Sequence, residues 1–257
     1  MSSTAASCAR FTYPAGPSGA VVIDLEGAGP EEHILTVIRT QRRFYESDLL
    51  DHLAAHGPRG GVYVDVGANI GNHSVFFGRF LADQVVAIEP DPHLVRLLER
   101  NLRANRVPRC TVLPVAVGAR PGTGRLSPRS GYEGNAGAQR VVPAGADAEG
   151  PTVPVDTLDR LLAGLGEPVA DDVRLMKLDI EGMELEALAG AHHLLEAQRP
   201  DIVAEAASDV EHAGLHALLS GYGYREIARF CSTPTYHFSD PGRAWPRGAA
   251  PSNQERR

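Results

Sequence analysis

The fold is decided by the stretch Val62-Tyr63-Val64-Asp65-Val66-Gly67-Ala68-Asn69-Ile70-Gly71. It begins with β-branched and aromatic residues, which favour a short, buried, parallel strand. The strand pattern breaks at Gly67, and Gly71 precedes a helical pattern that runs to Leu81. A strand that passes through a glycine turn into a helix N-terminus lets backbone N–H groups approach a ligand closely. The stretch therefore predicts a ligand-binding turn, with a turn that only reverses the chain as the alternative.

The spacing of the turn is Gly-x-Asn-x-Gly, which departs from the Gly-x-Gly-x-x-Gly of dinucleotide enzymes. Asn69 and Asn72 stand at the second and third glycine positions of that fingerprint. The next predicted strand runs from Gln84 to Pro90, and its Glu89 lies 24 residues after Asp65. An α/β nucleotide site places an acid at about this distance to bind the ribose hydroxyls. The two strands together predict a site for a nucleoside-containing cofactor.

Farther along the chain, strand and helix patterns alternate, which predicts a doubly wound, mostly parallel α/β sheet of Rossmann-like type. A third strand is predicted over 111–117, and a final antiparallel strand over 234–238. Asp91-Pro92 is expected to begin a helix, with Asp48 and Asp156 as N-caps of two others. The remaining predicted strands are 173–182, 201–205 and 224–230.

Three further segments have a distinct composition. Val21–Leu25 is predicted to be a short strand, and the first ten residues are expected to be mobile. Residues 31–56 have a helical pattern interrupted by Phe44-Tyr45-Glu46. These helices are expected either to cover the ligand crevice or to pack against the sheet edge. Residues 118–151 are rich in Gly and Pro and are expected to form an irregular loop on the substrate side, with Gly131, Gly134 and Gly137 around Tyr132 and Asn135.

The chain has 257 residues and a net charge of −7, which argues against nucleic acid as the main partner. The N-terminus has no basic region followed by an apolar run, and no stretch reaches the ~18 apolar residues of a membrane helix. We therefore expect neither a signal peptide nor a membrane span. The three cysteines, Cys8, Cys110 and Cys231, are widely separated and have no metal-ligand spacing. They are typical of reduced thiols, so we expect a cytoplasmic protein.

Acidic residues follow three of the predicted strands: Glu89, Asp179 with Glu181, and Glu205. Ligands of open α/β sheets bind beyond the carboxyl ends of the strands. Strand alternation puts Lys177, Asp179 and Glu181 on one side if the strand extends that far. Buried like charges need a shared proton, a metal ion or a cation. The cluster therefore predicts a general base, a divalent-metal site with Asp179 and Glu205 as candidate ligands, or a network neutralised by Lys177.

Several other ionisable residues have both a functional and a structural interpretation. Glu181 and Glu184 also suit the N-terminus of the following helix. His73 and His237 are candidate bases, with His237 facing the crevice from a late strand. His192 and His193 come late in a helix predicted over 183–196, where the C-terminal end of a helix favours them without any further role.

The ordered motifs of the chain resemble those of the FkbM-type methyltransferase family over about residues 44–206. Residues 1–40 and 207–257 match nothing that can be named. The motifs are Asp65-Val66-Gly67-Ala68-Asn69-Ile70-Gly71, Glu89-Pro90-Asp91-Pro92, Val155-Asp156-Thr157-Leu158-Asp159, Lys177-Leu178-Asp179-Ile180-Glu181-Gly182-Met183-Glu184, Arg199-Pro200 and Glu205.

The resemblance implies a Rossmann-like fold that binds S-adenosyl-L-methionine and transfers its methyl group, usually to an oxygen. It implies that Asp65, Gly67, Asn69 and Gly71 frame the methionine part of the cofactor, and that Glu89 holds the ribose. Backbone near Ala116 and Val117 would flank the adenine, and Ala68 and Pro90 complete the expected cofactor site. Asp179, Glu181 and Glu205 are the expected catalytic residues, on the geometric argument above.

This interpretation divides the chain into an N-terminal segment with lid helices (1–57), a methyltransferase domain (58–240) and a flexible tail (241–257). The expected partner is a small-molecule acceptor with a hydroxyl group, such as a natural product, sugar or polyketide, and a homodimer is left open. The alternatives are a nucleotide- or NAD-dependent oxidoreductase, a nucleic-acid or amine methyltransferase, and a non-catalytic cofactor-binding protein. Asn69 at a glycine position counts against the first, and Asp179-Ile180-Glu181-Gly182 after the fourth strand counts against the second.

Overall fold

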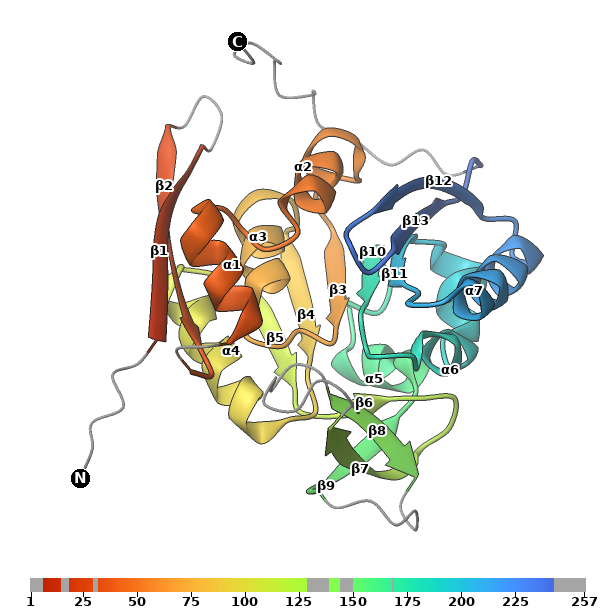
Figure 1. Ribbon diagram of the computed structural model, residues 1–257. Coiled ribbons are helices and arrows are strands. Elements are labelled where there is room, and N and C mark those ends of the chain that lie inside the picture. Colours follow the sequence, from red (N-terminus) through yellow and green to blue (C-terminus); the bar gives the residue numbers. More distant parts are fainter. Residues whose placement is uncertain are drawn as a thin grey trace.

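The centre of the molecule is a seven-stranded sheet with the strand order β12-β13-β11-β10-β3-β4-β5 (Figure 1). The computed structural model describes residues 7–14, 19–29, 32–128, 139–143, 150–167 and 169–242. All strands of this sheet run parallel except β13, which is antiparallel to β11 and β12. The predicted fold class, final antiparallel strand included, is thus confirmed. The strands are β3 (Val62–Val66), β4 (Gln84–Ile88), β5 (Cys110–Leu113), β10 (Val173–Leu178), β11 (Asp201–Glu205), β12 (Arg225–Phe230) and β13 (Thr235–Ser239).

Helices cover both faces of this sheet because consecutive strand residues point to opposite faces. Val62, Val64 and Val66 of β3 face one core, whereas Tyr63 faces the other. The first core is closed by α5 (Leu158–Leu165), α6 (Glu184–Ala189), the π-helical turn η2 (Leu194–Gln198) and α7 (Asp209–Gly221). The second is closed by α1 (His33–Gln41), α2 (Ser47–His56), α3 (Asn72–Phe80) and α4 (Pro92–Ala104).

A predicted helix cap is confirmed at one of three positions. Asp91 is the N-cap of α4, and its side chain accepts a hydrogen bond of 2.7 Å from His93 N. Asp48 is not a cap, because α2 already begins at Ser47. Asp156 is not a cap either, because Thr157 caps α5 and Asp156 instead pairs with Arg160 at 2.8 Å.

A second, four-stranded sheet occupies the region between β5 and α5 (Figure 1). The strand predicted over 111–117 is wrong in extent, because β5 ends at Leu113 and residues 116–117 pair in the second sheet. The segment 118–151 is not irregular throughout, since it contains two strands; its Tyr132, Asn135 and the glycines around them lie outside the described residues. The second sheet comprises β6 (Ala116–Val117), β7 (Gly122–Pro128), β8 (Gln139–Pro143) and β9 (Thr152–Asp156).

The N-terminal part forms an antiparallel hairpin of β1 (Ser7–Pro14) and β2 (Ala20–Gly27). The strand predicted at Val21–Leu25 is therefore confirmed, whereas the expected mobility of the first ten residues is wrong from Ser7 on. Two asparagines hold this hairpin: Asn101 of α4 bonds the backbone of Glu26, and Asn105, the C-cap of α4, bonds that of Asp24. Most of the predicted tail, from residue 243, lies outside the described residues. None of the described helices has the length and apolar composition of a membrane span.

Candidate active site

A cavity of about 220 Å³ lies at the carboxyl ends of the parallel strands. Its walls come from the ends of β3, β4, β10 and β11 and from the connection between α1 and α2. The second sheet and the turn between β12 and β13 complete it. This is the place where open α/β sheets bind their ligands.

The glycine turn after β3 forms one wall of the cavity. Gly67 has a φ of +78°, and a Cβ there would lie 1.9 Å from the carbonyl oxygen of Asp179. The N–H groups of Gly67 and Ala68 both donate to Ile88 O at 3.0 Å, and that of Gly71 donates to Ala68 O. These amides are therefore engaged within the protein, contrary to the expectation that they face a ligand. Gly67 is required because two strand ends meet there.

Glu89 lies at the end of β4, on the cavity wall and only 6% exposed. Asn69 N donates to Oε2 and Asp91 N to Oε1, each at 2.9 Å. Asn69 has a φ of +51°, a conformation that asparagine tolerates better than most residues. Burial raises the pKa of Glu89 to about 7, although the two N–H groups oppose this shift. A carboxylate has about four acceptor positions, so Glu89 retains acceptors for a ligand.

An apolar wall lies beside Glu89 and Pro90. The predicted residues Ala116 and Val117 are part of it, together with Leu126 and Val141 of the second sheet. Gln139 of β8 also lines the cavity, and its Nε2 donates to Asp91 Oδ2 at 2.9 Å. The sequence placed residues 118–151 on the substrate side, but it did not single out Leu126, Gln139 or Val141 as site residues.

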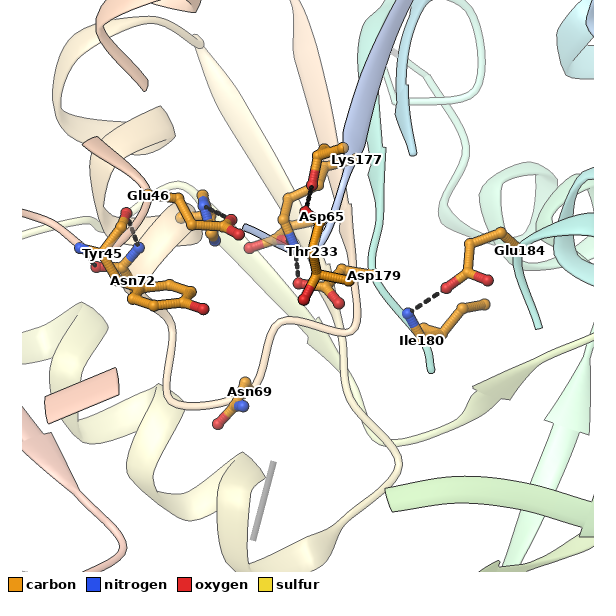
Figure 2. A network of polar contacts seen from close by, with 12 residues as sticks. Tyr45, Glu46, Asp65, Asn69, Asn72, Lys177, Asp179, Ile180, Glu184 and Thr233 are labelled. Carbon is orange, nitrogen blue, oxygen red and sulfur yellow. Dashed lines mark hydrogen bonds and ion pairs between the residues drawn. The ribbon is translucent and has the colours of Figure 1, made fainter. Parts of the chain in front are cut away.

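A buried lysine connects the ends of β3 and β10 (Figure 2). Lys177 is 1% exposed, and its Nζ lies 3.0 Å from Asp179 Oδ2 and 3.8 Å from Asp65 Oδ1. Burial lowers its pKa, but the charges of Asp179 and Asp65 outweigh burial and raise it. Asp65 is fully buried, accepts a 2.6 Å hydrogen bond from Ser74 and does not line the cavity. Its carboxylate thus stabilises the Lys177 ammonium from the side that faces away from the cavity.

Asp179 and Glu205 end the neighbouring strands β10 and β11, as predicted, and their carboxyl groups share a hydrogen bond. Burial and the adjacent Asp179 raise the pKa of Glu205 to about 10. Burial also acts on Asp179, but Lys177 and the bond from Glu205 outweigh it and lower that pKa. Asp179 is therefore the carboxyl group that favours the ionised form, and Glu205 the one that favours the protonated form.

This arrangement corresponds to the Lys177-neutralised network among the three predicted explanations. Within the described ranges, no three His, Cys, Asp or Glu side chains lie together as a metal group. The cation next to Asp179 is the Lys177 ammonium. A divalent cation held by Asp179 and Glu205 is therefore unsupported.

Glu181 and Glu184 follow β10 in different ways. Glu181 reaches the cavity wall from a turn in which its φ is +59°, because the strand ends at Leu178. Glu184 is buried at the start of α6, where its Oε1 accepts from Ile180 N at 2.8 Å. Glu184 therefore has a structural role, but it holds the turn before α6 through the N–H groups of Ile180 and Gly182.

The histidines fall into separate environments. His73 lines the cavity, with its Nε2 3.1 Å from Glu46 Oε2. His237 does not face the cavity, contrary to prediction, because it is fully buried between Asp201, at 3.2 Å, and His52, at 2.9 Å. The helix predicted over 183–196 is also wrong in extent. It is divided into α6 and η2, with His192 and His193 between them.

The connection between α1 and α2 contributes Tyr45 and Glu46 to the cavity, and the β12–β13 turn contributes Thr233. Sequence reasoning missed these as site residues. Two signals were present: Phe44-Tyr45-Glu46 interrupts the helical pattern, and Asn72 stands where the nucleotide fingerprint has glycine. Asn72 uses its side-chain amide to bond both the N and the O of Tyr45, at 3.0 and 3.1 Å.

The sequence of residues 65–226 matches the family model described as the methyltransferase FkbM domain. No curated protein matches the chain. Many solved structures match this one, and the identity and coverage of three are as follows. The first is the methyltransferase FkbM from Methylobacillus flagellatus KT, at 20% identity and a TM-score of 0.51. The match covers 70% of this chain but 43% of that one, so the chain spans less than half of that protein.

The second structure is the precorrin-6y C5,15-methyltransferase from Geobacter metallireducens, at 16% identity and a TM-score of 0.44, covering 75% and 84% of the two chains. The third is a Streptococcus mutans protein in complex with SAH, at 10% identity and a TM-score of 0.42, covering 76% and 96%.

Proposed function

Because the chain belongs to the FkbM methyltransferase family, we propose that it transfers a methyl group from S-adenosylmethionine to a hydroxyl oxygen of a small molecule. The acceptor would be a natural product, a sugar or a polyketide. The observation that carries this proposal is Glu89, a buried carboxylate held by two backbone N–H groups on the wall of the cavity. A carboxylate in this place suits the two hydroxyls of a ribose.

The remaining cavity wall supports the same cofactor. Ala116 and Val117 offer an apolar surface beside Glu89 for an adenine ring. The turn containing Gly67, Ala68 and Asn69 leads from Glu89 toward Asp179 and suits the methionine part. When bound, S-adenosylmethionine supplies a sulfonium-activated methyl group. The protein's own contribution is then mainly positioning, which supplies up to ~7–11 kcal/mol in favourable cases.

Asp179 is the residue that we propose to accept the hydroxyl proton of the acceptor. Lys177 keeps it ionised, and Glu205 donates a hydrogen bond to it. A weak base suffices here, because the acceptor oxygen becomes strongly acidic as its new C–O bond forms. Glu205, protonated at neutral pH, orients Asp179 and does not itself take the proton. Glu181 lies on the same wall and would contact the acceptor.

The test is methyl transfer from labelled S-adenosylmethionine to a panel of hydroxyl, carboxyl and amine acceptors, with the product methyl group located by mass spectrometry and NMR. We expect an O-methyl product. Asp179→Asn should retain the cofactor affinity while turnover falls by roughly 10²–10⁴-fold, the usual span for general acid–base catalysis. Methylation at nitrogen or carbon, or near-normal turnover of Asp179→Asn, would contradict the proposal.

A further inference from the structure

A carboxylate, Glu46, and an imidazole, His73, face each other on the cavity wall beside the glycine turn. Glu46 Oε2 lies 3.1 Å from His73 Nε2, and both side chains line the cavity. His73 is 6% exposed, and its Nε2 has no hydrogen-bond partner among the described residues, so the contact with Glu46 is close but poorly aligned. A buried ring nitrogen in this state is available to a ligand group.

The position of Glu46 is fixed from three directions. Its φ is +55°, an unfavourable conformation for glutamate. Asn72 clamps the backbone of the preceding Tyr45, and Phe44 packs edge-on against Phe76 with ring centroids 5.2 Å apart. The Cys231 thiol also bonds the Glu46 carboxylate. Strain that the surroundings hold in place in this way is typical of ligand-binding residues.

The two residues have opposite preferences for a ligand. His73 lies in the first turn of α3, where the N-terminal end of the helix favours an anion. Glu46 favours a cation. Glu46 and His73 therefore offer contacts for a positive group and a negative group, with only 3.1 Å between Oε2 and Nε2. An α-amino acid carries an ammonium and a carboxylate on one carbon.

We propose that Glu46 and His73 bind the methionyl α-amino acid group of S-adenosylmethionine, Glu46 its ammonium and His73 its carboxylate. This inference rests on the proposed function. Glu46 lies outside residues 65–226, so recognition of the cofactor would depend on the segment that precedes the family match. The other occupant of this wall would be the acceptor.

The test compares three probes in calorimetric titrations: S-adenosylmethionine, S-adenosylhomocysteine and 5′-methylthioadenosine, which lacks the amino acid group. Glu46→Gln removes the charge and keeps the size. We expect it to weaken the first two probes by on the order of 10- to 100-fold, the range for hydrogen bonds to charged groups, and to leave methylthioadenosine unchanged. His73→Gln should show the same pattern. Asp48→Asn, an exposed acid two residues away, is the matched control and should bind all three normally.

Each outcome has a separate meaning. Unchanged affinity of Glu46→Gln for all three probes overturns the inference and assigns the wall to the acceptor. An equal loss for methylthioadenosine also overturns it, because the effect would then not involve the amino acid group. Failure of the wild-type protein to bind S-adenosylmethionine would instead refute the proposed function itself.

Discussion

The two ends of the cavity bury carboxyl groups in different ways. At the β4 end, Glu89 is held by two backbone N–H groups, one from Asp91 and one from Asn69 in the glycine turn, and its pKa is about 7. At the β10–β11 end, Asp179 and Glu205 depend on each other and on Lys177, and the pKa of Glu205 is about 10. Backbone amides stabilise a carboxylate without adding a charge. In the side-chain network, by contrast, the charges of Asp179, Glu205 and Lys177 must compensate one another.

We infer from this difference that the β4 end of the cavity binds the cofactor and that the β10–β11 end handles the proton of the acceptor. A carboxylate that titrates near neutrality with fixed donors is suited to holding hydroxyl groups. A carboxyl pair with one proton beside a buried ammonium is suited to handling a proton. Substitutions at the two ends should therefore affect different quantities, and the following predictions test this separation.

The largest effect is expected for Gly67→Val, at the point where the two ends meet. Its Cβ would lie 1.9 Å from the Asp179 carbonyl oxygen, and its φ of +78° is unfavourable for valine. We expect a loss of about 5 kcal/mol or more in the free energy of unfolding, measured by urea denaturation, or no folded protein. Gly118→Ala is the control, because its Cβ meets only Val155 Cγ1 at 3.0 Å. Near-normal stability of Gly67→Val would show that the turn is not constrained by β10.

Lys177→Met should have the next largest effect. It removes the buried cation and leaves Asp65 and Asp179 uncompensated, which should destabilise the protein by about 3–5 kcal/mol. Adding Asp65→Asn should restore part of this loss, because the second change removes one of the unpaired charges. A urea midpoint that does not move in Lys177→Met would argue against a charge-balanced network.

Glu89→Gln should affect binding more than stability. We expect S-adenosylmethionine affinity to fall by about 1–3 kcal/mol, because a charged acceptor is lost. Folding stability should fall less than in Lys177→Met, because the variant removes a buried charge but leaves one of the two backbone N–H groups facing the Gln amide nitrogen. Glu205→Ala should leave the affinity unchanged and reduce turnover, because Asp179 loses the hydrogen bond that orients it. Equal losses of affinity in both variants would mean that the two ends of the cavity do not have separate roles.

The smallest predicted effect is on the pH dependence of cofactor binding. Because the pKa of Glu89 is about 7, affinity should rise roughly tenfold between pH 6 and 8, as one proton is lost. Its contribution to folding has the opposite sign. The folded pKa lies above the ordinary 4.5, so the contribution is fully present below pH 4.5 and is lost as the pH rises through about 7. Titrations of Glu89→Gln should show a flat pH profile for affinity.

The sequence predicted the β4 end well because its determinants are local. Strand alternation, the glycine turn and the spacing to Glu89 are all expressed in one short stretch of residues. It also predicted that Asp179 and Glu205 end neighbouring strands, since parallel order follows from the α/β alternation.

The rest depends on contacts between distant segments. The engagement of the turn amides with Ile88 O and the clamp of Asn72 on Tyr45 are not visible in a periodic pattern. His237 has the alternation of a strand residue, but its partners come from α2 and the start of β11. The second sheet was missed because a dense run of Gly and Pro usually indicates a loop, and pairing between separate segments overrides that preference.

The most direct test of the account is a crystal structure of the protein with S-adenosylhomocysteine. The account predicts that the ribose hydroxyls lie within about 2.6–3.2 Å of the Glu89 carboxylate oxygens, with the adenine against Ala116 and Val117. A ribose bound elsewhere, with Glu89 contacting only Asn69 N and Asp91 N, would contradict it.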